Sequence, residues 1–181
     1  TGSTWGGFYW DSNDKLYLYD AATGMQKESA GRFRDTSAWY HIVVAVDAAN
    51  TIAKAWVNGT EVAWDSQNTN PSNTDGKAMA ATAHYIGNDS AGYDMDGYIT
   101  EVHTCDGLYL DHEDFGKTDP TTGQWIPIEY TGGHGTYGSY LIFSDNSNTT
   151  SGTLGADSSA NSNDWTPTNF SVAAGAGKDS V

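Results

Sequence analysis

The stretch Ala55-Trp56-Val57-Asn58-Gly59-Thr60-Glu61-Val62 decides the fold of this chain. Apolar and β-branched residues flank a central Asn58-Gly59 pair, which tolerates the positive φ angles of a two-residue type I′ turn. The twist of that turn matches the twist of two antiparallel strands. The sequence therefore predicts a β-hairpin with strands at Ile52–Asn58 and Thr60–Trp64.

Short strand-like runs recur on both sides of this hairpin. Turn-forming Gly, Asn, Asp and Ser residues separate the runs, and no helical periodicity extends beyond one or two turns. This pattern is typical of an antiparallel sandwich or barrel. The other predicted strands are Trp5–Trp10, Lys15–Asp20, Gln26–Phe33, Trp39–Asp47, Ala83–Gly87, Tyr98–Cys105 and Ser139–Ser144.

Three segments carry more particular expectations. The most apolar run, Trp39–Val46, predicts a central strand that is buried on both faces. Leu110–Phe115 predicts a single helical turn. Prolines and clustered glycines after Asp119 argue against regular structure in the segment that follows.

The composition excludes several classes of partner. The formal net charge is −15 on 181 residues, whereas binding to nucleic acid or to an anionic membrane surface requires a basic face. No run approaches the roughly 18 apolar residues that insert across a bilayer. Aliphatic residues are scarce, but the chain has 7 Trp, 11 Tyr and 5 Phe. We therefore expect a folded domain in which aromatic rings fill the core between two sheets.

Several blocks follow one another in an order that is known from one family. They are Asp35-x-x-x-Trp39-Tyr40-His41-Ile42-Val43-Val44, Ala55–Gly59, Ile86-Gly87, Asp96–Val102 and the turn at Leu110–Phe115. Over roughly residues 5–117 the chain resembles laminin G-like domains of the concanavalin A-like lectin/glucanase superfamily. The resemblance implies an all-β fold, in which residues 1–118 form a two-sheet antiparallel β-sandwich of the jelly-roll type.

Residues 119–181 form a Gly/Ser/Asn-rich extension, which we expect to be an extended C-terminal arm. The extension resembles segments that follow such domains in structural proteins of marine bacteriophages, on the blocks Trp125–Gly132, Tyr140–Phe143 and Asp157–Asn163. It departs from them at Ala160 and Ser162, where glycines are usual. We expect a strand at residues 139–144 to complete the sandwich or to pair with a neighbouring subunit, because an open sheet edge invites aggregation. Trp165 and Phe170 are the expected anchors of the tail.

The resemblance implies a function at the surface of a virion. The chain would be a structural module of a bacteriophage, in a tail fibre or on the capsid surface, with a lectin-like domain for host attachment. The expected partners are a cell-surface glycan, other virion subunits and further copies in a homo-oligomer, and the expected location is the virion surface or the extracellular space. Two alternatives stay open, namely an assembly or decoration module without a ligand, and a glycoside hydrolase.

A hydrolase needs two carboxyl groups about 5.5 Å apart for retention, or about 6.5–9.5 Å apart for inversion. Laminarinase-like members of the superfamily place Glu-x-Asp-x-x-Glu along one strand, and no glutamate of this chain fits that pattern. Asp94 and Asp96, with Glu101 beyond, are the nearest substitute, but they also fit a turn before a strand. We expect no catalytic residues and no enzymatic activity.

Calcium is the one cofactor that the residues suggest. Ca²⁺ takes six to eight oxygen ligands, and relatives in the superfamily often bind one at the rim of the sandwich. The candidate metal ligands are Asn88, Asp89, Asp94 and Asp96. The alternative interpretation is that these residues are solvated turn acids.

Aromatic residues beside turns are the candidates for carbohydrate binding. Sugars stack their C–H faces on exposed rings, while a few polar groups fix the hydroxyls in a shallow site. The predicted carbohydrate-binding residues are Trp5, Trp10, Trp64 and Tyr93. Trp39 and Trp56 are expected in the core instead, and His41 is expected to be packed and hydrogen-bonded.

Overall fold

The computed structural model describes residues 5–65, 68–74, 76–77, 83–88 and 94–172. These residues belong to two compact units, of which unit 1 lies within residues 1–84 and 109–130 and unit 2 within residues 85–108 and 131–181. Every strand pairing is antiparallel. The fold is therefore all-β, a β-sandwich with accompanying hairpins, as the sequence predicted. The domain boundary expected after residue 118 stays a prediction.

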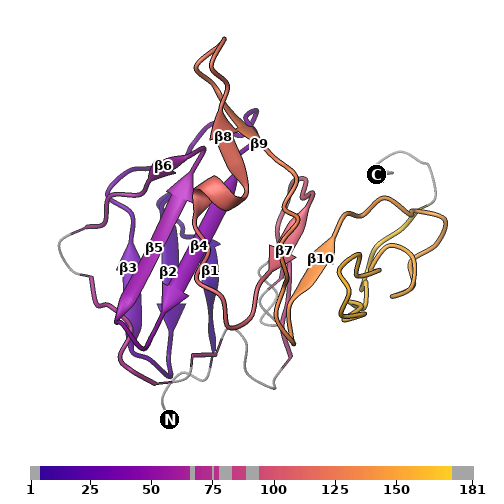
Figure 1. Ribbon diagram of the computed structural model, residues 1–181, viewed down its shortest axis with the longest axis horizontal. Coiled ribbons are helices and arrows are strands. Elements are labelled where there is room, and N and C mark those ends of the chain that lie inside the picture. The colour runs from indigo at the N-terminus through magenta and orange to yellow at the C-terminus, as the bar shows by residue number, and fades with distance from the viewer. Residues whose placement is uncertain (1–4, 66–67, 75, 78–82, 89–93, 173–181) are drawn as a thin grey trace. The chain divides into compact units, whose positions relative to one another are not determined.

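Two three-stranded sheets build unit 1, with the orders β1-β2-β3 and β4-β5-β6 (Figure 1). The first sheet contains β1 (Gly6–Trp10), β2 (Leu16–Asp20) and β3 (Met25–Glu28). The second contains β4 (Ile42–Asp47), β5 (Ile52–Val57) and β6 (Thr60–Glu61). All six lie within or overlap strands that the sequence predicted.

The hairpin at Asn58-Gly59 is confirmed. Asn58 and Gly59 have φ angles of 49° and 75°, and Val57 pairs with Thr60 across the turn. Gly59 has a second reason to be glycine, because a Cβ atom there would lie 2.2 Å from the ring of Trp125.

A buried apolar core joins the two sheets of unit 1. Alternate residues of a strand point to the same face, so Leu16 and Leu18 face the core while the residue between them faces outward. The buried members are Leu16, Leu18, Met25, Ala53, Ala55, Val57 and Val62, with Phe33, Tyr40, Val44 and Trp64 packed partly against them. Aliphatic side chains thus occupy the centre and rings its margin, so the expectation that rings fill the core is wrong.

The two sheets are also linked through the backbone along one edge. Ser29, directly after β3, forms an isolated antiparallel bridge with Trp64. The amide of Ala30 donates to the carbonyl of Ala63 over 2.8 Å. The chain that leaves β6 therefore pairs with the first sheet, which closes this side of the sandwich.

The strand β4 differs from its prediction in position. Val43 and Ala45 are buried on one face with Trp56, as the core assignment of Trp56 required, and Val44 packs on the other face. Within the described residues, however, β4 pairs only with β5, so it is not a central strand. Trp39 precedes the strand and is 64% exposed, so its assignment to the core is wrong.

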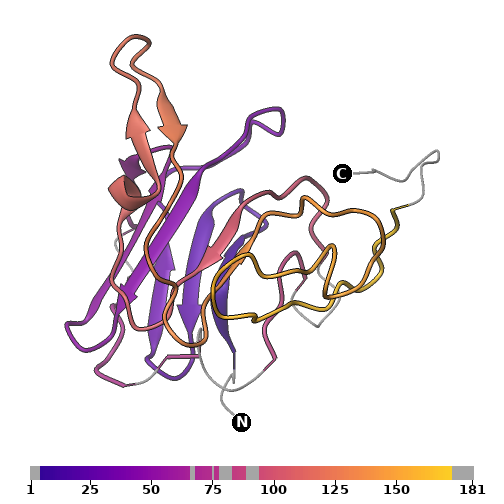
Figure 2. The same cartoon turned by 45° about the vertical axis from the view of Figure 1, so that its right-hand side comes forward.

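The helical turn and an unexpected hairpin complete unit 1. The turn is a 3₁₀ helix, η1 (His112–Asp114), whose N-cap Asp111 forms a capping box with Asp114. β8 (Gly116–Thr118) pairs with β9 (Trp125–Pro127), and Figure 2 shows the loop of this hairpin projecting from the unit. The expectation of no regular structure after Asp119 is therefore wrong. No helix in the described part of the chain could cross a membrane.

Unit 2 is built around one strand pair. β10 (Ser139–Leu141) pairs with β7 (Val102–Thr104) of the same chain. Trp165 anchors the tail, since its indole N–H donates to the Ser139 hydroxyl over 2.9 Å. Phe170 is 61% exposed and provides no such anchor. Residues 83–87 are described but form no strand, so that strand prediction is wrong.

Candidate functional site

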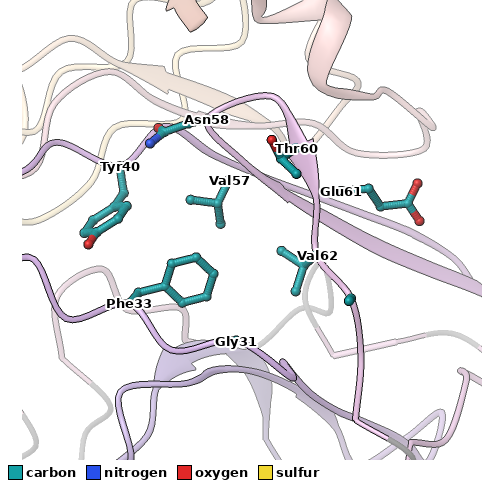
Figure 3. Close-up of a pocket in the computed structure, with 9 residues that line it drawn as sticks. Gly31, Phe33, Tyr40, Val57, Asn58, Thr60, Glu61 and Val62 are labelled. Atoms are coloured by element: carbon teal, nitrogen blue, oxygen red, sulfur yellow. The ribbon is translucent and has the colours of Figure 1, made fainter. Parts of the chain in front are cut away.

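An open pocket of about 450 Å³ lies between the segment that precedes β4 and the β5–β6 hairpin. Its walls come from two parts of unit 1 that the fold brings together (Figure 3). The lining residues are Gly31, Phe33, Tyr40, Val57, Asn58, Thr60, Glu61, Val62 and Ala63.

Apolar side chains form the inner surface of this pocket. Val57 and Val62 are each 8% exposed and belong to the core between the sheets. Figure 3 shows Phe33 and Val62 pointing into the hollow from different segments. The rings of Phe33 and Tyr40 meet edge to face, with centroids 5.9 Å apart, which is a favourable geometry for two aromatic rings.

Trp10 extends this aromatic wall. Its ring centroid lies 5.0 Å from that of Phe33 and 6.0 Å from that of Tyr40. Trp10 is 40% exposed, so part of its ring is available to a ligand. We call Trp10, Phe33 and Tyr40 the aromatic rim of the pocket. The sequence singled out Trp10 but missed the other two, although Tyr40 stands in the quoted Trp39-Tyr40-His41 block.

Polar groups at the pocket edge are already oriented by the protein. The Asn58 side-chain oxygen accepts the amide of His41 over 2.8 Å, and the Tyr40 hydroxyl accepts the amide of Asp35 over 3.1 Å. The Glu61 carboxylate pairs with Lys54 at 3.0 Å, and Figure 3 shows it pointing away from the hollow. The site is open and aromatic, and among its described lining residues the one charged group, Glu61, points away from the hollow.

His41 supports the turn beside the pocket, and its prediction is confirmed. It is half-buried, and the indole N–H of Trp125 donates to its Nδ1 over 3.0 Å. This hydrogen bond also fixes the tautomer, because Nδ1 must be the acceptor and the proton must lie on Nε2 of a neutral imidazole.

The other predicted aromatic residues lie elsewhere. Trp5 packs on Tyr19 and Tyr9 and not with the pocket residues. Trp64 is half-buried beneath Lys27, whose ammonium lies 5.1 Å from the ring centroid. Tyr93 falls outside the described residues.

The candidate calcium ligands are only partly brought together. The side-chain amide of Asn88 donates to a carboxylate oxygen of Asp94, while Asp96 is exposed and Asp89 falls outside the described residues. Among the described residues, no three His, Cys, Asp or Glu side chains converge on a metal position. The described oxygens are too few for Ca²⁺, so a calcium requirement stays a prediction and no chemical step is assigned to it.

The carboxylates that come nearest to a hydrolase pattern lie in an environment that does not favour catalysis. Asp94, Asp96 and Glu101 are all exposed. A carboxyl group that acts as a general acid near neutral pH is usually held in an apolar site, where desolvation raises its pKa. These three residues lack that environment in the described structure.

A β-sandwich with a shallow aromatic site belongs to a class of folds that often bind carbohydrate. The chain is a member of the concanavalin A-like lectin/glucanases superfamily, whose sequence pattern matches residues 1–113. No curated protein and no solved structure matches it. The superfamily includes both lectins and glycosidases, so membership connects the fold to carbohydrate without selecting between binding and cleavage.

Proposed function

We propose that the chain is a carbohydrate-binding module that holds a glycan at the aromatic rim of its pocket and does not cleave it. The observation that supports this proposal is the contact of Trp10 with Phe33 and Tyr40 beside an open apolar hollow. A pyranose ring presents an apolar C–H face and a hydroxylated edge. The aromatic rings can stack on the C–H face, and the polar groups of Asn58 and Thr60 can hydrogen-bond to the hydroxylated edge.

The charge of the protein narrows the ligand class. With a formal net charge of −15, the long-range field repels sulfated, sialylated or uronic-acid glycans. The described residues that line the pocket include no Lys or Arg. We therefore propose neutral glycans as the ligands of the pocket.

A glycan array tests this function most directly. We expect the array to retain the chain on neutral glycans. A chelator should leave this retention unchanged if calcium takes no part in binding, and it should abolish the retention if calcium is required. In calorimetry, Trp10→Ala should weaken binding about tenfold, the effect of removing a central aromatic contact. Trp39→Ala is the matched control, since it removes an equally large, exposed indole outside the pocket. Equal affinities for the two variants would refute the pocket as the site.

The absence of cleavage is tested separately. We expect no release of reducing ends from β-glucans by the purified chain. Release that disappears in Asp94→Asn or Asp96→Asn would favour the glycoside hydrolase alternative, because these two residues are the nearest substitute in this chain for the Glu-x-Asp-x-x-Glu pattern.

We further propose that the module acts on a bacteriophage virion, in a tail fibre or on the capsid surface, where it attaches the particle to host glycans. The resemblance of the blocks at Trp125–Gly132, Tyr140–Phe143 and Asp157–Asn163 supports this part. Light scattering after size exclusion should then show a homo-oligomer. An oligomer that retains no glycan would favour the assembly module without a ligand, and a monomer would count against both virion roles.

A further inference from the structure

A second group of aromatic rings lies on the outer face of the β1-β2-β3 sheet. Leu16 and Leu18 of β2 face the core, so Tyr17 and Tyr19 face outward. In the register of the sheet Tyr9 pairs with Tyr17. Trp5 adds a fourth ring through its contact with Tyr19. We call Trp5, Tyr9, Tyr17 and Tyr19 the outer-face patch.

The four rings of the outer-face patch form one continuous surface. The centroid of Trp5 lies 4.7 Å from that of Tyr19 and 5.6 Å from that of Tyr9, and Tyr9 lies 5.2 Å from Tyr17. Trp5 is 47% and Tyr9 40% exposed. Solvent therefore meets ring surface over both strands.

Gly7 lets the rings of the outer-face patch meet. It pairs with Tyr19 in the register and stands between Trp5 and Tyr9 on the same face of the strand. A Cβ atom at Gly7 would meet no atom within 4 Å. The missing side chain leaves the rings of Trp5 and Tyr9 free to approach each other above Gly7, with centroids 5.6 Å apart.

The described residues around the patch are polar. The side-chain amide of Gln26 donates to the Tyr17 hydroxyl. Lys15 shares this face of β2, but its ammonium already pairs with Glu28 at 2.8 Å and Asp65 at 3.1 Å. Burial, together with the neighbouring Tyr17 and Asp11, raises the pKa of Tyr9 to about 12, so its phenol stays a neutral hydrogen-bond donor.

We infer that the outer-face patch is a second carbohydrate-binding surface, which takes a neutral oligosaccharide stacked on the exposed rings of Trp5 and Tyr9. The inference shares its ligand class with the proposed function but uses none of the pocket residues. A purely apolar partner would bury the Tyr9 phenol, which is costly unless the phenol has a hydrogen-bond partner. An anionic ligand would meet Asp11 and Glu28, and the ammonium of Lys15 is already paired with Glu28 and Asp65.

The test displaces two rings without removing either. Gly7 has no positive φ, so Gly7→Val fits the strand and places its side chain beneath the contact of Trp5 with Tyr9. The matched controls are Phe8→Ala, which removes a 55% exposed ring from the opposite face of β1, and Gly133→Val, where a Cβ atom also meets nothing within 4 Å. Thermal melts should show that all three variants fold.

Calorimetric titration uses cellohexaose, laminarihexaose and mannohexaose as neutral probes and hexagalacturonate as the anionic probe. We expect the wild-type chain to bind one of the neutral probes at two sites. Gly7→Val should lose one site, or weaken it about tenfold, and Trp10→Ala should lose the other. Both controls should bind like the wild type. The oligosaccharide should quench indole fluorescence on binding, and part of this quenching should disappear in Trp5→Phe.

The outcomes separate this inference from the proposed function. Loss of a site in Gly7→Val but not in Trp10→Ala would support the outer-face patch and refute the pocket. Unchanged binding in Gly7→Val would overturn the outer-face patch, and so would preference for hexagalacturonate at that site. A change of oligomeric state in Gly7→Val, measured by light scattering, would overturn it in favour of a contact between copies.

Discussion

Lys27 shows what a single buried charge does to this fold. It is 6% exposed on the inner face of β3, paired in register with Leu18, and its ammonium lies over the Trp64 ring. Burial lowers its pKa from the ordinary value of 10.5, because removing the ammonium from water disfavours the charged form. Trp64 therefore partly compensates a charge, which is why we leave it out of the proposed binding sites.

Replacing this lysine should stabilise the protein. Lys27→Met keeps the apolar stem and removes the desolvated charge, so we expect the Tm at pH 7 to rise by about 2–4 °C. Since the folded-state pKa is lowered, wild-type stability should increase as pH rises from that pKa towards 10.5, and this increase should vanish in the variant. Lys54→Met is the control, because the hydrogen bond with Glu61 raises the pKa of Lys54 and gives the opposite trend. Melts at several pH values that showed no difference between the two variants would contradict this account.

Gly116 shows how close packing restricts a single residue. A Cβ atom there would lie 2.3 Å from the Trp125 ring, and Gly116 is not among the residues with positive φ. Gly116→Ala should therefore destabilise unit 1 by steric overlap alone, by about 1–3 kcal/mol in urea unfolding. Trp125→Ala should abolish that penalty in the double mutant, since the overlap needs both groups. Additive effects would show that the ring is not the cause.

At the scale of elements, the sequence predicted those turns and strands whose conformation depends only on neighbouring residues. The Asn58-Gly59 turn could be predicted because its two φ angles depend on those two residues. β9 could not, because a segment near two prolines becomes a strand only when Trp125 packs against Gly59 and Gly116. The apolar composition of β4 predicted that its residues are buried, but it could not predict the place of β4 in the sheet, because strand order depends on segments that are distant in the sequence.

The β7–β10 pair of unit 2 contains an acid-sensitive contact. Nδ1 of His103 lies 3.0 Å from Nε2 of His134, and the His103 ring stacks on Tyr140 at 3.9 Å. One imidazole must donate and the other accept, so at least one of them must be neutral. Burial lowers the pKa of His134 below its ordinary 6.5, and nearby Asp157 offsets this only in part.

Unit 2 should consequently lose stability in mild acid. A His with a lowered folded-state pKa contributes stability that is complete above about pH 6.5 and declines as pH falls through the folded-state pKa. Burial raises the pKa of Asp157, but the hydrogen bonds that its carboxylate accepts outweigh this and hold the pKa below its ordinary 3.8, so this group affects stability only below about pH 3.8. Thermal melts between about pH 4.5 and 6.5 should therefore fall less steeply for His134→Gln than for the wild type.

For the whole molecule, the sequence could name candidate aromatic residues but not how they group. Trp5 and Trp10 were both candidates for carbohydrate binding, and because five positions along a strand reverse the face, the two rings belong to different clusters. Phe33 and Tyr40 reach Trp10 only through the pairing of distant strands. The sequence could therefore offer Trp10 as a candidate but could not predict the pocket that it borders.

The net charge gives a prediction that concerns the entire chain. A formal charge of −15 destabilises the compact state through self-repulsion, and salt screens that repulsion. We expect the Tm to rise between about 50 mM and 500 mM NaCl, while the affinity for a neutral oligosaccharide changes by less than about twofold. An anionic glycan should instead bind better as salt increases. Binding that weakened with salt would indicate an attractive charge pair with the ligand, and it would contradict the neutral ligand class proposed for both surfaces.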